Sequence, residues 1–189
     1  MNLAFISDIH SNLEGLEKVI KKMEDFSIDK IYCLGDIVGY GDNPNEVIEL
    51  LKLNNIYCIK GNHDDMLING SLEEKYNFPF TQKIITVESM NFLANLQDNI
   101  ILIEEDAILS HAVPFSSNIY LYSNSDFTIL DSVNYKYIFM GHTHYPMLMS
   151  YYDKKVINPG SVGQPRDSNS KSSFLICDMK DERFEFIRI

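Results

Sequence analysis

Short β-rich runs alternate with longer amphipathic runs through the first half of the chain. The β-rich runs cover residues 3–7, 30–34 and 56–60, and the amphipathic runs between them cover 13–26 and 45–53. Strand–helix–strand units of this kind pair their strands in parallel through right-handed crossovers. The alternation therefore predicts an α/β domain built on a parallel sheet.

The second half of the chain is mainly strand-like and follows a mostly helical middle. We expect helices at 63–69 and 81–96, separated by a polar loop at 69–81 with the composition of a mobile flap. The expected strand pairs are 100–103 with 107–110, 147–151 with 155–157, and 173–178 with 184–189, beside a short helix at 126–133 and a strand at 137–140. The sequence has no internal repeat or linker, which predicts a single domain over residues 1–189.

The composition is that of an ordinary globular protein. A chain of 189 residues with 45% hydrophobic and 23% charged residues can form a sizeable core. No apolar run approaches the roughly 18 residues that a membrane helix needs, and the N-terminus lacks the basic segment that begins a signal peptide. We expect a soluble, cytoplasmic protein with no membrane partner. The sequence is compatible with a homo-oligomer and does not decide the oligomeric state.

The three cysteines, Cys33, Cys58 and Cys177, lie far apart, each within an apolar, strand-like stretch. An odd number of isolated cysteines argues against a disulfide framework or a thiolate metal site. Free cysteine is among the most buried residue types. We expect all three to be small buried hydrophobes.

The formal net charge of −11 limits the classes of partner. Nucleic-acid binding draws most of its affinity from clustered Lys and Arg, so long nucleic acid is excluded as a partner. An anionic substrate would need a local positive centre instead. Bound divalent cations are the strongest such centres that a protein can offer.

Every histidine of the chain follows a predicted strand. The five are His10, His63, His111, His142 and His144, and the first four have Asp, Asn, Gly or Ser directly beside them. In open α/β sheets, ligands bind outside the carboxyl ends of the strands. These loops should therefore converge on one edge of the sheet.

Two of these loops carry paired side chains at positions i and i+2. Asp8 and His10 follow the first strand, and His142 and His144 follow a later one. In an extended loop, such residues point the same way and can reach one cation. Taken alone, an Asp-x-His pair is more often simply a turn.

Three further candidates complete the set. Asp36 follows Gly35 and offers two oxygens that can bridge two metals, although it could equally cap a helix. Asn62 offers a neutral oxygen suited to a site rich in negative charge, or it could form an Asx-turn into a helix. His111 ends a strand. The occurrence of all these segments in order, each after a strand, favours a metal site.

In this order and spacing, the motifs resemble the calcineurin-like metallophosphoesterase superfamily. They are Asp8-x-His10, Gly35-Asp36, Gly61-Asn62-His63-Asp64, a strand-end His111 and Gly141-His142-x-His144. The stretches 8–14, 35–41 and 158–166 look like the small bacterial branch of phosphodiesterases and diadenosine-tetraphosphatase-like proteins.

The resemblance implies a four-layer α/β/β/α sandwich and a dinuclear metal centre. One metal would be bound by Asp8, His10, Asp36 and His144, and the other by Asp36, Asn62, His111 and His142. His63 would ligate neither metal. It would lie beside the substrate as a general acid or as a donor to the phosphoryl oxygens.

Elementary chemistry agrees with this assignment. Two cations about 3.5–4 Å apart can hold the phosphoryl oxygens and an attacking hydroxide while neutralising charge in the transition state. The departing oxygen needs a proton, which His63 suits, helped if Asp64 or a carbonyl orients its ring. Mixed nitrogen and oxygen ligands suit Mn, our first choice, and also Fe, Ni, Co or Zn.

Departures from the family narrow the substrate. Protein phosphatases and the larger symmetrical dinucleoside tetraphosphatases carry an Arg shortly after the Gly-Asp motif, and none stands at 38–41 here. Arg166 is the remaining candidate for a phosphate clamp, or an ordinary surface arginine. Asn12 could contact phosphate, although a helix cap is favoured. The aromatic residues Tyr40, Phe115, Tyr120, Tyr122 and Tyr145 could stack on a base, although packing is the commoner role.

The sequence thus favours a hydrolase for a small phosphodiester or a dinucleoside polyphosphate. One alternative is a phosphomonoesterase or protein phosphatase, because the same metals serve either ester. The other is a non-catalytic scaffold, since a retromer subunit resembles this fold. His63 argues for the enzyme, because a scaffold has no chemical need for a proton donor that ligates nothing.

Overall fold

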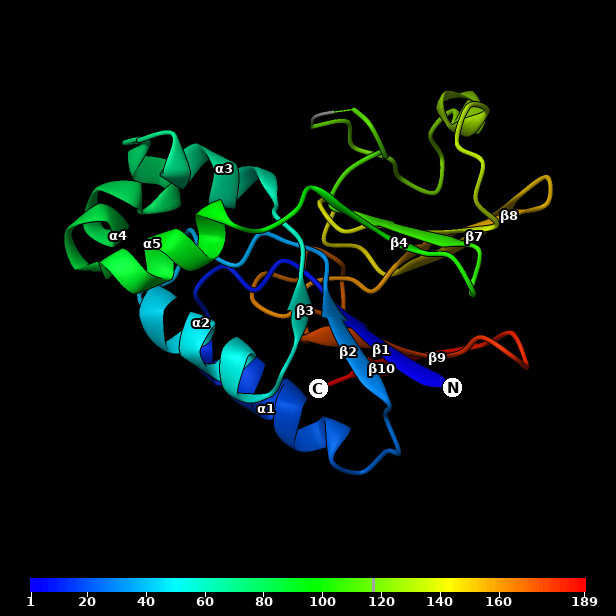
Figure 1. Ribbon diagram of the computed structural model, residues 1–189, viewed down its shortest axis with the longest axis horizontal. Helices are drawn as coiled ribbons and strands as arrows, with labels where there is room; N and C mark the ends of the chain where they lie inside the picture. Colours follow the sequence, from blue (N-terminus) through cyan, green and yellow to red (C-terminus); the bar gives the residue numbers. More distant parts are fainter. Residues whose placement is uncertain (117) are drawn as a thin grey trace.

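The computed structural model describes residues 1–116 and 118–189, which form two mixed five-stranded sheets (Figure 1). The first sheet has the order β10-β9-β1-β2-β3 and the second the order β4-β5-β6-β8-β7. Within the first, β1, β2 and β3 are parallel, and within the second, β5, β6 and β8 are parallel. Antiparallel strands complete each sheet, which confirms the predicted α/β class.

The strands fall close to the predicted positions. The first sheet contains β1 (Asn2–Ile6), β2 (Lys30–Cys33), β3 (Tyr57–Cys58), β9 (Ser173–Asp178) and β10 (Arg183–Arg188). The second contains β4 (Asn99–Leu102), β5 (Ala107–Ser110), β6 (Tyr137–Phe139), β7 (Met147–Tyr151) and β8 (Lys154–Asn158).

The helices are α1 (Leu13–Met23), α2 (Pro44–Leu53), α3 (Asn62–Ile68), α4 (Phe78–Ile84) and α5 (Val87–Ala94), with 3₁₀ turns η1 (Glu74–Tyr76) and η2 (Phe127–Leu130). The single helix predicted over 81–96 is wrong, because the backbone is extended at Ile85. Thr86 then caps α5 by accepting a hydrogen bond from the Ser89 amide at 3.1 Å. The segment predicted as a polar loop at 69–81 contains η1 and the start of α4.

Helix α1 shows why the first crossover forms where it does. The Asn12 side chain accepts a hydrogen bond from the Gly15 amide at 2.9 Å, which is the predicted N-cap. Leu16, Val19 and Met23 then recur at helical spacing and are buried against the first sheet. Helices α1 and α2 cover one face of that sheet (Figure 1).

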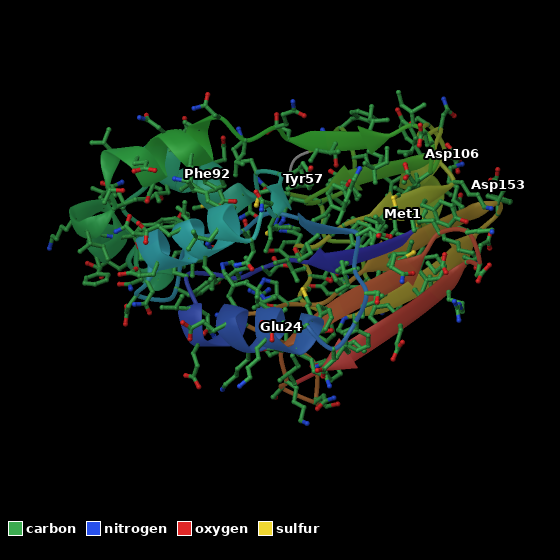
Figure 2. All side chains as sticks on the ribbon, turned by 60° about the horizontal axis from the view of Figure 1, so that its bottom comes forward. Met1, Glu24, Tyr57, Phe92, Asp106 and Asp153 are labelled. Atoms are coloured by element: carbon green, nitrogen blue, oxygen red, sulfur yellow. The ribbon has the colours of Figure 1, made fainter. Side chains whose placement is uncertain are left out.

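The two sheets pack face to face around an apolar core. Phe5 of β1 stacks on Phe139 of β6, with ring centroids 3.9 Å apart. Leu3, Leu109 and Leu175 are fully buried around this pair. The side chains that fill the layers are drawn in Figure 2. This packing fixes the ends of β1 and β6 relative to each other.

The outer face of the second sheet has a thinner cover than the first. Turn η2 and neighbouring loop residues bury Val113, Leu121, Leu130 and Val133 against it. The fourth layer is thus a 3₁₀ turn with loops, among the described residues. None of the described helices has both the length and the apolar character needed to cross a bilayer.

Two of the three cysteines are buried as predicted, and Cys58 departs from the prediction. Cys33 and Cys177 are buried, Cys58 is partly buried, and all three are free thiols. Burial raises the pKa of Cys177 to about 12, so this thiol stays protonated at neutral pH.

Candidate metal centre

Loops from both sheets meet beyond the carboxyl ends of β1, β2, β5 and β6. The Asp8 amide donates to the Gly35 carbonyl at 3.0 Å, which joins the loops after β1 and β2. The Gly141 amide donates to the His111 carbonyl at 2.9 Å, which joins the loops after β5 and β6. The side chains of these loops are therefore held against one another, as the strand-end argument predicted.

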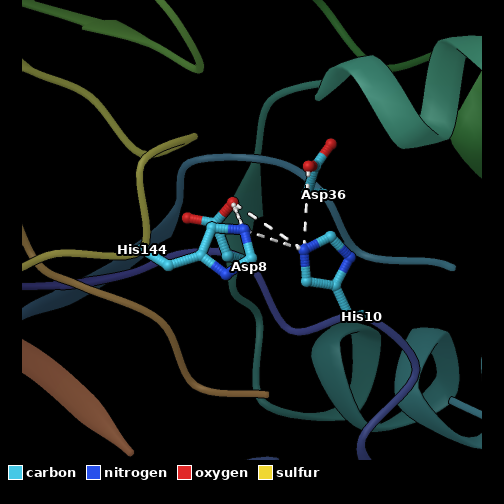
Figure 3. Close-up of side chains that lie close together, drawn as sticks. All are labelled: Asp8, His10, Asp36 and His144. Carbon is cyan, nitrogen blue, oxygen red and sulfur yellow. Dashed lines mark hydrogen bonds and ion pairs between the residues drawn. The ribbon is translucent and has the colours of Figure 1, made fainter. Parts of the chain in front are cut away.

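The first group consists of Asp8, His10, Asp36 and His144, all buried and facing one another (Figure 3). His10 Nε2 lies 3.2 Å from His144 Nε2 and 3.8 Å from Asp36 Oδ2. His144 Nε2 lies 3.3 Å from Asp8 Oδ1. One small cation could touch all four side chains.

The second group consists of Asp36, His111 and His142, joined by Asn62. His111 Nε2 lies 3.3 Å from Asp36 Oδ2 and 3.1 Å from Asn62 Oδ1. His142 Nδ1 lies 3.2 Å from His111 Nε2. Asp36 Oδ2 therefore faces both groups, and the two buried clusters are consistent with a dinuclear metal site.

Backbone carbonyls fix the tautomers of three of these histidines. The Nδ1 atoms of His10, His111 and His144 lie 3.1, 2.7 and 2.6 Å from the carbonyls of Val38, Leu34 and Gln164. A carbonyl only accepts, so each Nδ1 carries the proton. Each Nε2 then points into the centre, and where the ring is neutral it offers a lone pair there, which is how a metal-binding imidazole is held.

The residues present fit a pair of divalent cations. The two facing Nε2 lone pairs of His10 and His144 repel each other unless something positive lies between them. Asp8 Oδ1 is buried and has no hydrogen-bond partner among the described residues. Such an atom costs free energy unless a cation or proton satisfies it. With nitrogen and oxygen donors only, the set suits first-row divalent metals.

The electrostatics of the centre also favour positive charge. Burial alone would raise the pKa of Asp36, but His111 and His10 hold it below its usual range, so Asp36 stays ionised. Burial alone would lower the pKa of His111, but Asp36 raises it to about 10. Burial, then His111, lower the pKa of His142 to about 3. The carboxylates thus retain one cationic partner even without metal.

Several of these side chains are presented by left-handed backbone. The φ angles are 53° at Asp8, 51° at His10, 53° at Asp36, 68° at His142 and 64° at His144. Residues other than glycine adopt this region at a cost, roughly 1–3 kcal/mol each when the site is strained, and such residues gather at functional sites. The fold holds these conformations through the loop-to-loop hydrogen bonds.

His63 lies beside the centre in an aromatic pocket. Its ring is 4.7 Å from His10, 4.3 Å from Tyr76 and 5.1 Å from Tyr40, measured between centroids. Its Nδ1 is buried, has no hydrogen-bond partner among the described residues and packs against Gly39, where an added Cβ would lie 2.6 Å away. Burial lowers the pKa of His63.

Asp64 is tied to backbone rather than to the His63 ring. Its Oδ1 accepts from the amides of Ile37 and Val38 at 2.9 and 3.1 Å, and its Oδ2 accepts from Gly61 at 2.9 Å. These bonds join the loops after β2 and β3. The structure therefore gives Asp64 a scaffolding contact in place of the ring-orienting contact predicted from the sequence.

Asn12 and Arg166 occupy different positions. The side-chain amide of Asn12 makes two hydrogen bonds. Its oxygen accepts from Gly15 in the α1 cap, and its nitrogen donates to the Gly163 carbonyl at 3.1 Å. Arg166 is exposed, with its Nη2 3.2 Å from Gln164 Oε1. The carbonyl of the same Gln164 lies 2.6 Å from His144 Nδ1, so Arg166 lies on the side of the first group.

Sequence reasoning missed the supporting contacts. The buried Asn158 side chain donates to the Gly141 carbonyl at 2.6 Å and so holds the loop of His142 and His144. Tyr120 stacks on His142, with centroids 3.8 Å apart. Asn158 begins the stretch 158–166 that carries part of the family resemblance, but its role as a loop anchor does not follow from spacing.

Comparison with known proteins points to one family. The family model described as the calcineurin-like phosphoesterase superfamily domain matches residues 1–182. An uncharacterized protein of Methanocaldococcus jannaschii is 40% identical over 99% of this chain and 86% of its own length. The phosphodiesterase YfcE of Escherichia coli is 24% identical over 91% of this chain and 85% of its own. The crystal structure of a metallophosphoesterase from Sphaerobacter thermophilus superposes with a TM-score of 0.84 at 29% identity, covering 100% of this chain and 88% of that one.

Proposed function

This chain belongs to the calcineurin-like phosphoesterase superfamily, and from that premise we propose that it hydrolyses a small phosphodiester or a dinucleoside polyphosphate. The family makes it a phosphoesterase. The narrower substrate class is our inference, and it is supported by the phosphodiesterase among its relatives and by the charge around the site.

We assign the metals to the two buried groups. Asp8, His10, Asp36 and His144 would hold one ion, and Asp36, Asn62, His111 and His142 the other. The observation that carries this assignment is Asp36 Oδ2, which lies 3.8 Å from His10 Nε2 and 3.3 Å from His111 Nε2 and so faces both groups. When bound, two such ions supply a Lewis acid for the phosphoryl oxygens and lower the pKa of a water. Mn²⁺ is our first choice of metal.

His63 would supply the proton that the departing oxygen needs. It lies 4.7 Å from His10, between ring centroids, beside the first group. Burial lowers its pKa, which keeps the free ring mostly neutral at pH 7. An anionic substrate beside the ring raises that pKa and favours the protonated donor. Tyr40 and Tyr76 pack against the ring, with centroids 5.1 and 4.3 Å from it.

The surroundings favour a small substrate. The net charge is −11, and no Arg follows the Gly-Asp motif at 38–41. Beyond the metals, Arg166 on the rim is our candidate for an additional phosphate contact. A phosphoprotein or long nucleic acid would find little positive surface to bind.

A substrate panel tests the proposal. The protein is saturated with Mn²⁺, and kcat/KM is compared for bis(p-nitrophenyl) phosphate, p-nitrophenyl phosphate, cyclic nucleotides, diadenosine tetraphosphate and a phosphopeptide. We expect a diester or dinucleotide to give the highest value, because kcat/KM reports transition-state discrimination. A higher value for a monoester or the phosphopeptide would overturn the substrate class and leave the metal assignment standing.

A further inference from the structure

A cavity of about 560 Å³ adjoins the second metal group. Asn62 and His111 are among the residues that line it, so a ligand bound at that group would lie beside the cavity. Its volume falls within the roughly 300–1,000 Å³ of small-molecule sites and is large enough for a nucleoside or an aryl alcohol. The roles proposed for the metal ligands and for His63 leave this cavity without a function.

The charged groups that line the cavity disfavour a second phosphate. Lys60 is the one cationic Lys or Arg side chain among the described residues that line it. Its Nζ lies 3.3 Å from Asp65 Oδ1 and 3.1 Å from Asp98 Oδ1, so two carboxylates offset one ammonium. A phosphate placed there would meet net negative charge.

Phe115 supplies an aromatic surface in the cavity lining. Its side chain is 71% exposed, and its backbone is left-handed, with φ at 62°. A large apolar side chain held in this way gains little from packing and exposes a ring face to whatever enters the cavity. Proteins that bind a base regardless of its identity usually stack it on an aromatic side chain.

We propose that this cavity is the subsite for the organic arm of the substrate, a nucleoside or aryl group that stacks on Phe115 and carries no further phosphate. The inference rests on the proposed function, because the phosphate that bears the arm lies on the metals. It also separates two sides of the site. Additional phosphates are directed towards Arg166, near the first group, and the uncharged arm is directed into the cavity.

Binding to the Mn²⁺-loaded protein tests this without relying on turnover. Calorimetry gives the Kd of inorganic phosphate, glycerol 3-phosphate, thymidine 5′-monophosphate and thymidine 3′,5′-bisphosphate, and free phosphate is assayed alongside so that hydrolysis is not mistaken for binding. We expect thymidine 5′-monophosphate to bind more tightly than glycerol 3-phosphate. The bisphosphate should bind more weakly than the monophosphate.

Two variants locate the effect. Phe115→Ala should weaken thymidine 5′-monophosphate by roughly 5- to 100-fold, the range for loss of a stacked aromatic, and leave inorganic phosphate unchanged. Asp98→Asn should narrow the gap between bisphosphate and monophosphate by a few-fold.

The turn between β7 and β8 offers matched controls. Tyr152 is 85% exposed and also left-handed, with φ at 53°, and Asp153 lies beside it. Tyr152→Ala and Asp153→Asn should change none of the four constants.

The outcomes separate the two proposals. Failure of inorganic phosphate to bind the Mn²⁺-loaded protein would refute the metal centre and with it the proposed function. Normal phosphate binding without a preference for the thymidine ligand, or a preference that survives Phe115→Ala, would refute the subsite alone. A loss of affinity for all four ligands in Phe115→Ala would also refute it, because the residue would then support the centre.

Discussion

The site has a buried floor and an exposed rim, and their side chains differ in how firmly the fold holds them. The floor comprises Asp8, His10, Asp36, His111, His142 and His144, all buried, with tautomers and backbone set by neighbouring loops. The rim includes Phe115, Tyr120 and Arg166, which are exposed. Chemistry common to many phosphate esters requires the fixed floor. In our proposal, choice among esters falls to the exposed side chains of the rim.

This contrast predicts that small changes to the floor reduce metal binding and turnover more than large changes to the rim do. Asp36→Ala should give the largest effect, because its Oδ2 faces both groups and its Oδ1 also accepts from the His63 amide at 2.8 Å. We expect bound Mn²⁺ to fall below one equivalent per chain, measured by elemental analysis, with turnover lost. Asp153→Ala, on an exposed turn, should keep two equivalents. Wild-type protein with less than one equivalent would contradict the dinuclear assignment.

His63→Ala should come next. The residue lies beside the floor without joining either group, so both metals should remain while kcat falls by roughly 10²–10⁴, the usual range for a general acid. Metal content and kcat are measured on the same preparation. If His63→Ala loses metal as Asp36→Ala does, the division between ligand and proton donor is wrong.

A single methyl group sharpens the comparison further. The Gly61 backbone is extended and would accept alanine, but an added Cβ would collide with the Asp36 amide nitrogen and Oδ1. Overpacking of this kind typically lowers the free energy of unfolding by about 1–3 kcal/mol. Gly61→Ala should therefore lower the urea midpoint and weaken Mn²⁺ binding together. A variant with wild-type stability and metal affinity would show that the loops yield more readily than the left-handed backbone suggests.

The sequence predicted the floor better than the rim for a physical reason. Strand ends in an α/β fold are fixed by topology, so the loops that bear His10, His111 and His142 had to converge. The interruption between α4 and α5 at Ile85 could not be predicted from the sequence, because neither proline nor glycine marks it. The carbonyls of Leu34, Val38 and Gln164, which set the tautomers, have no side-chain signature at all. Asp64 shows the same limit, since two of its backbone partners, Ile37 and Val38, lie 27 and 26 residues away in the sequence.

Arg166→Ala should give the smallest effect of the series, and one that depends on the substrate. The side chain is exposed and its recorded contact is with Gln164, so its removal should leave stability and metal content unchanged. An Arg fork recognises additional phosphate oxygens in a fixed geometry. We therefore expect kcat/KM to fall by about 3- to 10-fold for diadenosine tetraphosphate, which corresponds to the loss of one exposed charge-assisted contact. For bis(p-nitrophenyl) phosphate, with a single phosphate on the metals, kcat/KM should stay within about twofold of wild type, since no second phosphate reaches the rim.

Arg183, exposed at the end of β10, offers the matched truncation, and Arg183→Ala should affect neither substrate. Equal losses for both substrates in Arg166→Ala would mean that this arginine acts on the phosphate held by the metals, and the division between a uniform floor and a selective rim would then fail at this residue.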